Sequence, residues 1–234
     1  MALPKLTAPK YELTIPSTKK TVGFRPYLVK EEKILMIAME SEDDNQMTVA
    51  IKQIIDACTF NELDVNKLAM FDIEYIFAKL RAKSVGENVN VKLPCESCEH
   101  SNTVSINLDT EIQVSEGAEE NIKLTDDTGL IMKYPSMADY QDMQNSKESD
   151  IDKIFIMITL SINSIYSGDE LFDAKSHSRA ELIEFIDSLN ADQFKKIRNF
   201  LDKIPVAYVN AKFKCESCNH ENNIELKGLK NFFG

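Results

Sequence analysis

Two segments of this chain, 120 residues apart, have nearly the same sequence, and each contains a pair of cysteines. Residues 89–100 read VNVKLPCESCEH and residues 209–220 read VNAKFKCESCNH, so eight of the twelve positions are identical. A helix-forming segment precedes each copy, and alternating apolar residues flank the cysteines on both sides. The repeat therefore predicts two copies of one unit: a helix, a strand, a Cys-x-x-Cys knuckle and a strand.

The spacing of the cysteines has a physical reason. In a tight turn between two strands, both thiolates of a Cys-x-x-Cys pair can point at one ion about 2.3 Å away. Two facing knuckles would supply a tetrahedral, zinc-ribbon-like site, with Cys95, Cys98, Cys215 and Cys218 as ligands. Four protein ligands leave no open position, so the predicted Zn²⁺ is structural and not catalytic.

Other arrangements of these cysteines stay open. Four thiolates can also hold an iron–sulfur cluster, whereas a catalytic dithiol usually lies at a helix N-terminus and not between strands. Because 116 residues separate Cys98 from Cys215, one shared site would clamp two distant segments together. The alternative is two half-sites, each completed by another subunit or by His100 and His220. The position of each histidine, two residues after a cysteine, suits hydrogen bonding to a thiolate better than ligation.

The rest of the chain alternates helical and strand-like patterns. The expected fold class is α+β, a helical body with β-hairpins and two Cys-x-x-Cys knuckles. We divide the chain into residues 1–86 (an N-terminal hairpin and helices), 87–134 (the first knuckle and a β section), 135–205 (a helical section) and 206–234 (the second knuckle and a C-terminal tail). A shared metal site would join these segments into one cooperative unit. The tail Leu229–Phe233 is expected either to close the core or to dock into a partner.

Two strongly apolar segments are expected in the core. The first is a helix over residues 31–41, with Ile34, Leu35, Met36, Ile37 and Met39 dense enough to be largely buried. The second is a helix over residues 151–165. Cys58 lies on the apolar face of a further helix and is expected to be a buried thiol.

Charge limits the expected partners. The chain has 27 Lys and Arg against 38 Asp and Glu, a net charge of −11, which repels phosphate backbones and anionic lipids. Acidic residues also flank the knuckles, where a nucleic-acid-binding ribbon would need basic ones: Glu96, Glu99, Glu216 and Glu221. The longest uncharged stretch is shorter than the roughly 20 apolar residues of a membrane-spanning helix, and no signal-peptide pattern is present. We therefore expect neither nucleic acid nor a membrane as a partner. Because a chain made and kept in the cytosol holds its cysteines reduced, we also expect no disulfides.

Nothing in the sequence indicates catalysis. The seven glycines are dispersed, so no phosphate-binding loop forms, and no Gly-x-Ser-x-Gly or His-Glu-x-x-His motif is present. A non-enzymatic protein is the prediction. The alternatives are a zinc-ribbon module that binds nucleic acid or has a regulatory role, and a metalloenzyme or redox enzyme.

Three segments resemble the T4-like bacteriophage baseplate hub proteins. They are residues 23–41 (GFRPYLVKEEKILMIAMES), 71–87 (FDIEYIFAKLRAKSVGE) and 129–135 (GLIMKYP). The resemblance implies a structural or assembly component of the baseplate hub of a contractile-tailed phage. Other hub and tail proteins would be its partners, in the virion or in the host cytoplasm during assembly, and a homo-oligomer stays open. The resemblance assigns no binding residues, so the metal prediction rests on the cysteines.

Overall fold

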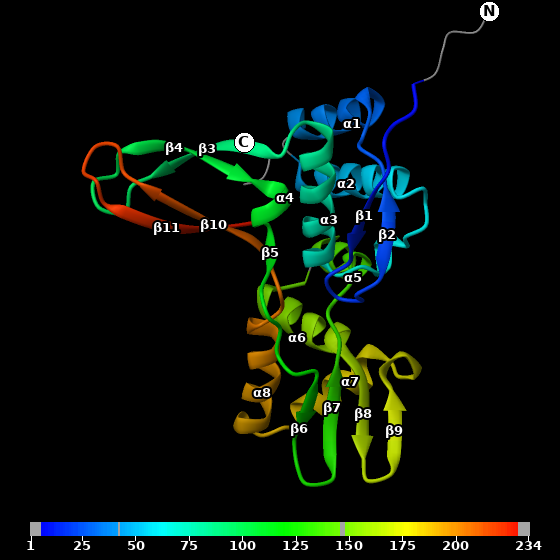
Figure 1. The fold of residues 1–234 in the computed structure, drawn as a ribbon. Helices are drawn as coiled ribbons and strands as arrows, with labels where there is room; N and C mark the ends of the chain where they lie inside the picture. Colours follow the sequence, from blue (N-terminus) through cyan, green and yellow to red (C-terminus); the bar gives the residue numbers. More distant parts are fainter. Residues whose placement is uncertain (1–5, 42, 146–147, 229–234) are drawn as a thin grey trace, which may run out of the picture. The chain divides into compact units, whose positions relative to one another are not determined.

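The structure, a computed structural model, describes residues 6–41, 43–145 and 148–228. The chain divides into two compact units, each containing helices and strands (Figure 1). The first combines the described parts of Met1–Ser115 and Val206–Gly234, and the second is Glu116–Pro205. The expected mixture of helix and sheet is confirmed, while the four-segment division stays a prediction.

The first unit begins with a β-hairpin and continues with helices. Strand β1 (Tyr11–Thr14) pairs antiparallel with β2 (Thr21–Phe24). The helices of this unit are, in chain order, α1 (Val29–Glu40), α2 (Asp44–Cys58), the short 3-10 helix η1 (Val65–Lys67), α3 (Met70–Ser84) and α4 (Leu108–Glu111). Asp43 caps α2 as its sequence predicts, because its side chain accepts a hydrogen bond from the N–H of Asn45 at 2.8 Å.

A buried carboxylate ties the hairpin to α3. Asp72, in the first turn of α3, is fully buried and accepts hydrogen bonds from the N–H (2.9 Å) and the Oγ (2.5 Å) of Ser17 in the hairpin turn. Burial raises the pKa of Asp72, although the bonds from Ser17 oppose the shift. The packing between hairpin and helix therefore includes a specific polar contact.

Helix α1 is far more exposed than its sequence suggests. Leu35 and Ala38 are buried, but Met36, Ile37 and Met39 are 64%, 55% and 47% exposed. The expectation that this run of apolar residues is largely buried is therefore wrong. A helix turns by about 100° per residue, so consecutive apolar residues cannot all face one neighbouring element.

Two further hairpins carry the repeated segments. The first consists of β3 (Asn88–Pro94) and β4 (Ser101–Asn107), and the second of β10 (Ala207–Lys214) and β11 (Glu221–Lys227). A short strand, β5 (Gln113–Val114), pairs antiparallel with the start of β10, giving the sheet order β11-β10-β5. Figure 1 shows the two hairpins side by side, with their turns meeting at one end.

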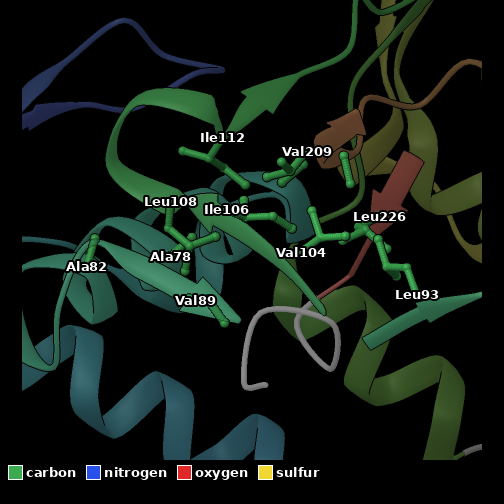
Figure 2. Close-up of a cluster of buried hydrophobic side chains, with 12 residues drawn as sticks. Ala78, Ala82, Val89, Leu93, Val104, Ile106, Leu108, Ile112, Val209 and Leu226 are labelled. Carbon is green, nitrogen blue, oxygen red and sulfur yellow. The ribbon is translucent and has the colours of Figure 1, made fainter. Parts of the chain in front are cut away.

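One apolar cluster joins the two hairpins to α3 and α4 (Figure 2). Its buried members are Ala78, Ala82, Val89, Leu93, Val104, Ile106, Leu108, Ile112, Ala207, Val209, Ala211 and Leu226. Both hairpins contribute alternate residues of their strands, as expected of strands with one buried face. The packed faces hold the hairpins together over much of their length.

The second unit is a four-stranded antiparallel sheet with helices. The strand order is β6-β7-β8-β9, from β6 (Asn121–Lys123), β7 (Thr128–Met132), β8 (Ile162–Ser167) and β9 (Glu170–Asp173). The helices are α5 (Met137–Asn145), α6 (Asp150–Ser161), η2 (Ala174–Ser176), α7 (Arg179–Asp187) and α8 (Ala191–Asp202). Ser178 and Asn190 both form the expected capping boxes, at α7 and α8.

The apolar segment 151–165 differs from its prediction. Only its first part is helical, since α6 ends at Ser161 and Ile162 begins strand β8. Ile151 and Ile154 are also 68% and 51% exposed, so the helix is not fully in the core. Apolar runs without strict periodicity are compatible with helix or buried strand. The predicted role of the tail Leu229–Phe233 lies outside the described residues.

Candidate metal centre

The repeat in sequence is a repeat in structure. In the first hairpin Val89 lies opposite Ile106, and in the second Val209 lies opposite Leu226, with every pair shifted by the same 120 residues. The two hairpins therefore have the same register and the same turn length. Equal registers bring the two Cys-x-x-Cys turns to the same end of the paired hairpins.

Both turns have the same backbone geometry. In each, the N–H of the first cysteine donates to the carbonyl of the histidine at 2.9 Å, from Cys95 to His100 and from Cys215 to His220. The residue after the second cysteine has a left-handed backbone, Glu99 with φ 59° and Asn219 with φ 61°. Such a conformation is uncommon for residues other than glycine, and its recurrence marks one tight turn used twice.

The four cysteine sulfurs form one compact group. The Sγ of Cys95 lies 3.6 Å from that of Cys218, and the Sγ of Cys98 lies 3.7 Å from that of Cys215. All four lie within 4.8 Å of one another. Four thiolates about 2.3 Å from one zinc ion would be about 3.8 Å apart, whereas a disulfide requires about 2.05 Å. The spacing matches tetrahedral coordination, and all four cysteines are free thiols.

Backbone N–H groups are directed at the sulfurs. Those of Ser97 and Ser217 donate to the Sγ of Cys95 and Cys215, each at 3.4 Å. Hydrogen bonds from the N–H groups of Cys218 and Ser217 lower the pKa of Cys215 to about 6, against the effect of burial. The same turn geometry that fixes the cysteines therefore also stabilises negative charge on sulfur.

Ionisation of all four thiols together is unfavourable without a cation. The N–H of His100 favours the thiolate of Cys98, but the neighbouring thiols of Cys218 and Cys215, together with desolvation, raise the pKa of Cys98 to about 12. Four negative charges at this spacing would repel strongly. A divalent cation removes that penalty and deprotonates coordinating thiols, so the donor set suits a soft metal such as Zn²⁺.

Two asparagines link the knuckles to each other. The Oδ1 of Asn102 accepts from the N–H of Glu216 at 3.0 Å, and the Oδ1 of Asn222 accepts from the N–H of Glu96 at 2.9 Å. Both are 3% exposed. Sequence reasoning missed them, although each follows a knuckle histidine by two residues, and the 120-residue offset relates them as it relates the cysteines.

The histidine side chains and Cys58 are not part of this group of sulfurs. His100 and His220 are exposed, and the metal-capable cluster found among the described residues contains the four cysteines and neither histidine. Cys58 is fully buried, as expected, and burial raises the pKa of its thiol to about 11. A buried, protonated thiol is a poor nucleophile.

The fold and the cysteine group define a two-unit α and β protein whose duplicated hairpins converge on one cluster of four thiols. A family model described as T4 bacteriophage base plate protein matches residues 8–234, nearly the whole chain, and the chain belongs to this family. The resemblance seen in the sequence is thereby confirmed at the level of the family. Searches of curated proteins and of solved structures returned no significant match.

Membership of this family makes the chain a structural component of a phage baseplate. A baseplate component associates with other baseplate proteins, and its place is the tail of the virion. Of the helices formed by the described residues, none is long and apolar enough to cross a membrane.

Proposed function

We propose that this protein is a non-enzymatic component of the baseplate hub, or a factor for its assembly, and that one structural zinc ion stabilises its fold. The observation that carries the metal proposal is the group of four sulfurs, with Cys95–Cys218 at 3.6 Å and Cys98–Cys215 at 3.7 Å. Placement in the hub is supported by the resemblance of residues 23–41 and 71–87 to hub proteins.

The structural role of the ion follows from where its ligands lie in the chain. The first pair comes from the β3–β4 turn and the second from the β10–β11 turn, with the whole second unit between them in sequence. An ion bound to both turns closes a long loop, and binding energy at a site absent from the unfolded chain adds to folding stability. Four sulfur ligands leave no position for substrate or water.

An alternative role in nucleic-acid binding has less support. The exposed residues of the knuckles include Glu96, Glu99 and Glu216, which would face phosphates with like charge. We expect the protein to cause no shift in the electrophoretic mobility of DNA or RNA at low salt. Binding that weakens steeply with added salt would favour the alternative instead.

Elemental analysis tests the metal proposal. Protein purified without chelator should contain about one zinc ion per chain, and a thiol reagent should find the four knuckle cysteines protected until zinc is removed. Iron in place of zinc, or metal-free protein with the same stability, would count against structural zinc.

The test of placement in the hub requires phage-infected cells. An affinity-tagged chain should co-purify with hub proteins from assembly intermediates, as identified by mass spectrometry. Mass spectrometry of purified virions then separates a built-in subunit, which is retained, from an assembly factor, which is absent. Co-purification with other tail proteins and not with hub proteins would contradict hub placement.

A further inference from the structure

Helices α1 and α2 present an apolar face that no other described part of the chain covers. Val29, Met36, Ile37 and Met39 of α1 and Val49 of α2 are 45% to 79% exposed. Most exposed apolar residues of soluble proteins are scattered, whereas these lie on two neighbouring helices. Exposed apolar side chains gathered on neighbouring helices in this way mark an interaction surface.

This apolar face includes a groove between the two helices. It has a volume of about 290 Å³ and is lined by Ile34, Ile37 and Ala38 of α1 and by Asn45, Gln46, Val49, Ala50 and Gln53 of α2. Its walls are mainly apolar, with amides along the α2 side. Because residues of both helices line it, the groove lies between α1 and α2, which are neighbours in Figure 1.

The charges on α1 are arranged so that the helix complements itself. Lys33 and Glu40 are seven positions apart, about two helical turns, so they lie on one face. Met36 and Ile37 lie at the midpoint between them, on the exposed part of the helix. Both charges are exposed, and neither makes an ion pair with another described residue.

A second α1 related by a two-fold axis would match this pattern. If the axis passes between Met36 and Ile37, the helices run antiparallel, and Lys33 of each copy faces Glu40 of the other. The same axis places Met36 of each copy against Ile37 of the other and removes both side chains from water. Isologous contacts of this kind generate the symmetric dimer, the commonest oligomer of soluble proteins.

We infer that the α1–α2 face is the contact surface of a homodimer, in which two helical pairs pack as a four-helix arrangement around a two-fold axis. Contact with a different protein would not require that Lys33 and Glu40 complement a second copy of α1, nor that Met36 and Ile37 lie at their midpoint. The inference goes beyond the proposed function and does not depend on the metal, because the face contains none of the four knuckle cysteines.

Charge reversal on the full-length protein tests the dimer. Sedimentation equilibrium at protein concentrations on the order of 1–100 µM should show a monomer–dimer equilibrium. Lys33→Glu and Glu40→Lys should each weaken the dimer at least ~10-fold, because each places like charges opposite each other twice per dimer. Lys33→Glu combined with Glu40→Lys should restore the dissociation constant to within ~3-fold, since the pairs then exist with reversed sign.

A second variant and a control complete the test. Met36→Ser with Ile37→Ser should give a monomer whose circular dichroism and zinc content match the parent, because both side chains are exposed in the monomer. Lys20→Glu alters an exposed charge in the β1–β2 hairpin and should leave the dissociation constant unchanged. A parent that stays monomeric throughout, or a charge swap that fails to restore association, would overturn the inference and leave the face to another protein.

Discussion

The Sγ of Cys95 lies 3.6 Å from the Sγ of Cys218, so the first cysteine of one knuckle is beside the second cysteine of the other. The remaining pair, Cys98 and Cys215, repeats the relationship at 3.7 Å. The two knuckles are therefore related by a local two-fold axis within a single chain. An ion on this axis would contact both halves of the repeat equally, so a single ion would serve both knuckles.

Loss of either knuckle should have the same consequence. Cys95→Ser and Cys215→Ser should each lower the free energy of unfolding by on the order of 3 kcal/mol or more, and the double variant should lose little beyond either single one. Denaturant unfolding of zinc-loaded protein measures these effects. Ser97→Ala, an exposed knuckle residue that is not a ligand, is the matched control. Additive losses would indicate two independent sites.

The buried asparagines should matter for metal affinity as well as for stability. Asn102→Ala removes the acceptor for the N–H of Glu216 and should cost about 1–3 kcal/mol. Removing hydrogen bonds that support metal ligands typically lowers affinity 10- to 100-fold, and competition with a chromophoric chelator would measure the change. Asn222→Ala should behave alike, by the local two-fold axis. Asn223→Ala, adjacent but exposed, should have neither effect, and equal effects would contradict the assigned roles.

Glu74 should make the first unit sensitive to pH. Burial raises the pKa of its carboxyl from 4.5 to about 7, despite a hydrogen bond from the N–H of Ala207. The folded state thus binds this proton more tightly than the unfolded chain, so the contribution of Glu74 to stability is fully present below pH 4.5 and is lost as pH rises through 7. For Glu74 alone the loss approaches about 3 kcal/mol.

The matching experiment replaces the carboxyl by an amide. Glu74→Gln should remove this part of the pH dependence and stabilise the protein at pH 8 relative to the parent. Urea unfolding at several pH values between 5 and 8 measures the difference. Glu12→Gln, at an exposed position, serves as the control, and a parent with flat stability across this window would show the assignment to be wrong.

Replacing Gly129 of the second unit by a residue with a side chain should lower stability. It lies opposite Tyr166 in the β7–β8 pair, and a Cβ at this position would be 2.1 Å from the Oη of Tyr166 and 2.6 Å from the backbone oxygen of Ile122. Gly129→Ala should cost about 1–3 kcal/mol or more, because the backbone cannot move away easily. At Gly23, where the nearest atom to a Cβ is 4.0 Å away, alanine should be tolerated. Equal melting temperatures for the two variants would refute this packing.

Some features of the fold follow from short stretches of sequence. The capping residues Ser178 and Asn190 predict the starts of α7 and α8, because a cap forms within one turn of chain. The repeated segment predicts two hairpins of equal register and the four cysteines that they bring together. A local pattern suffices in these cases because the interacting groups are close in sequence or are copies of each other.

Other features required the tertiary structure. Met36 and Ile37 have the composition of core residues, yet they are exposed, because burial depends on which element packs against a face and not on the face itself. Ile162 continues an apolar run but begins strand β8, where pairing with β7 satisfies its backbone.

The sequence by itself determined the paired knuckles, because a repeat specifies the same backbone twice. Few chemical roles other than metal binding are open to two Cys-x-x-Cys turns between strands. Only the tertiary structure decided that Asn102 and Asn222 each bond the opposite knuckle, and that β5 pairs with β10 from more than 90 residues away. These contacts join segments that are distant in the chain. No periodicity within either segment encodes the partner, so their positions follow from the packing of the whole unit.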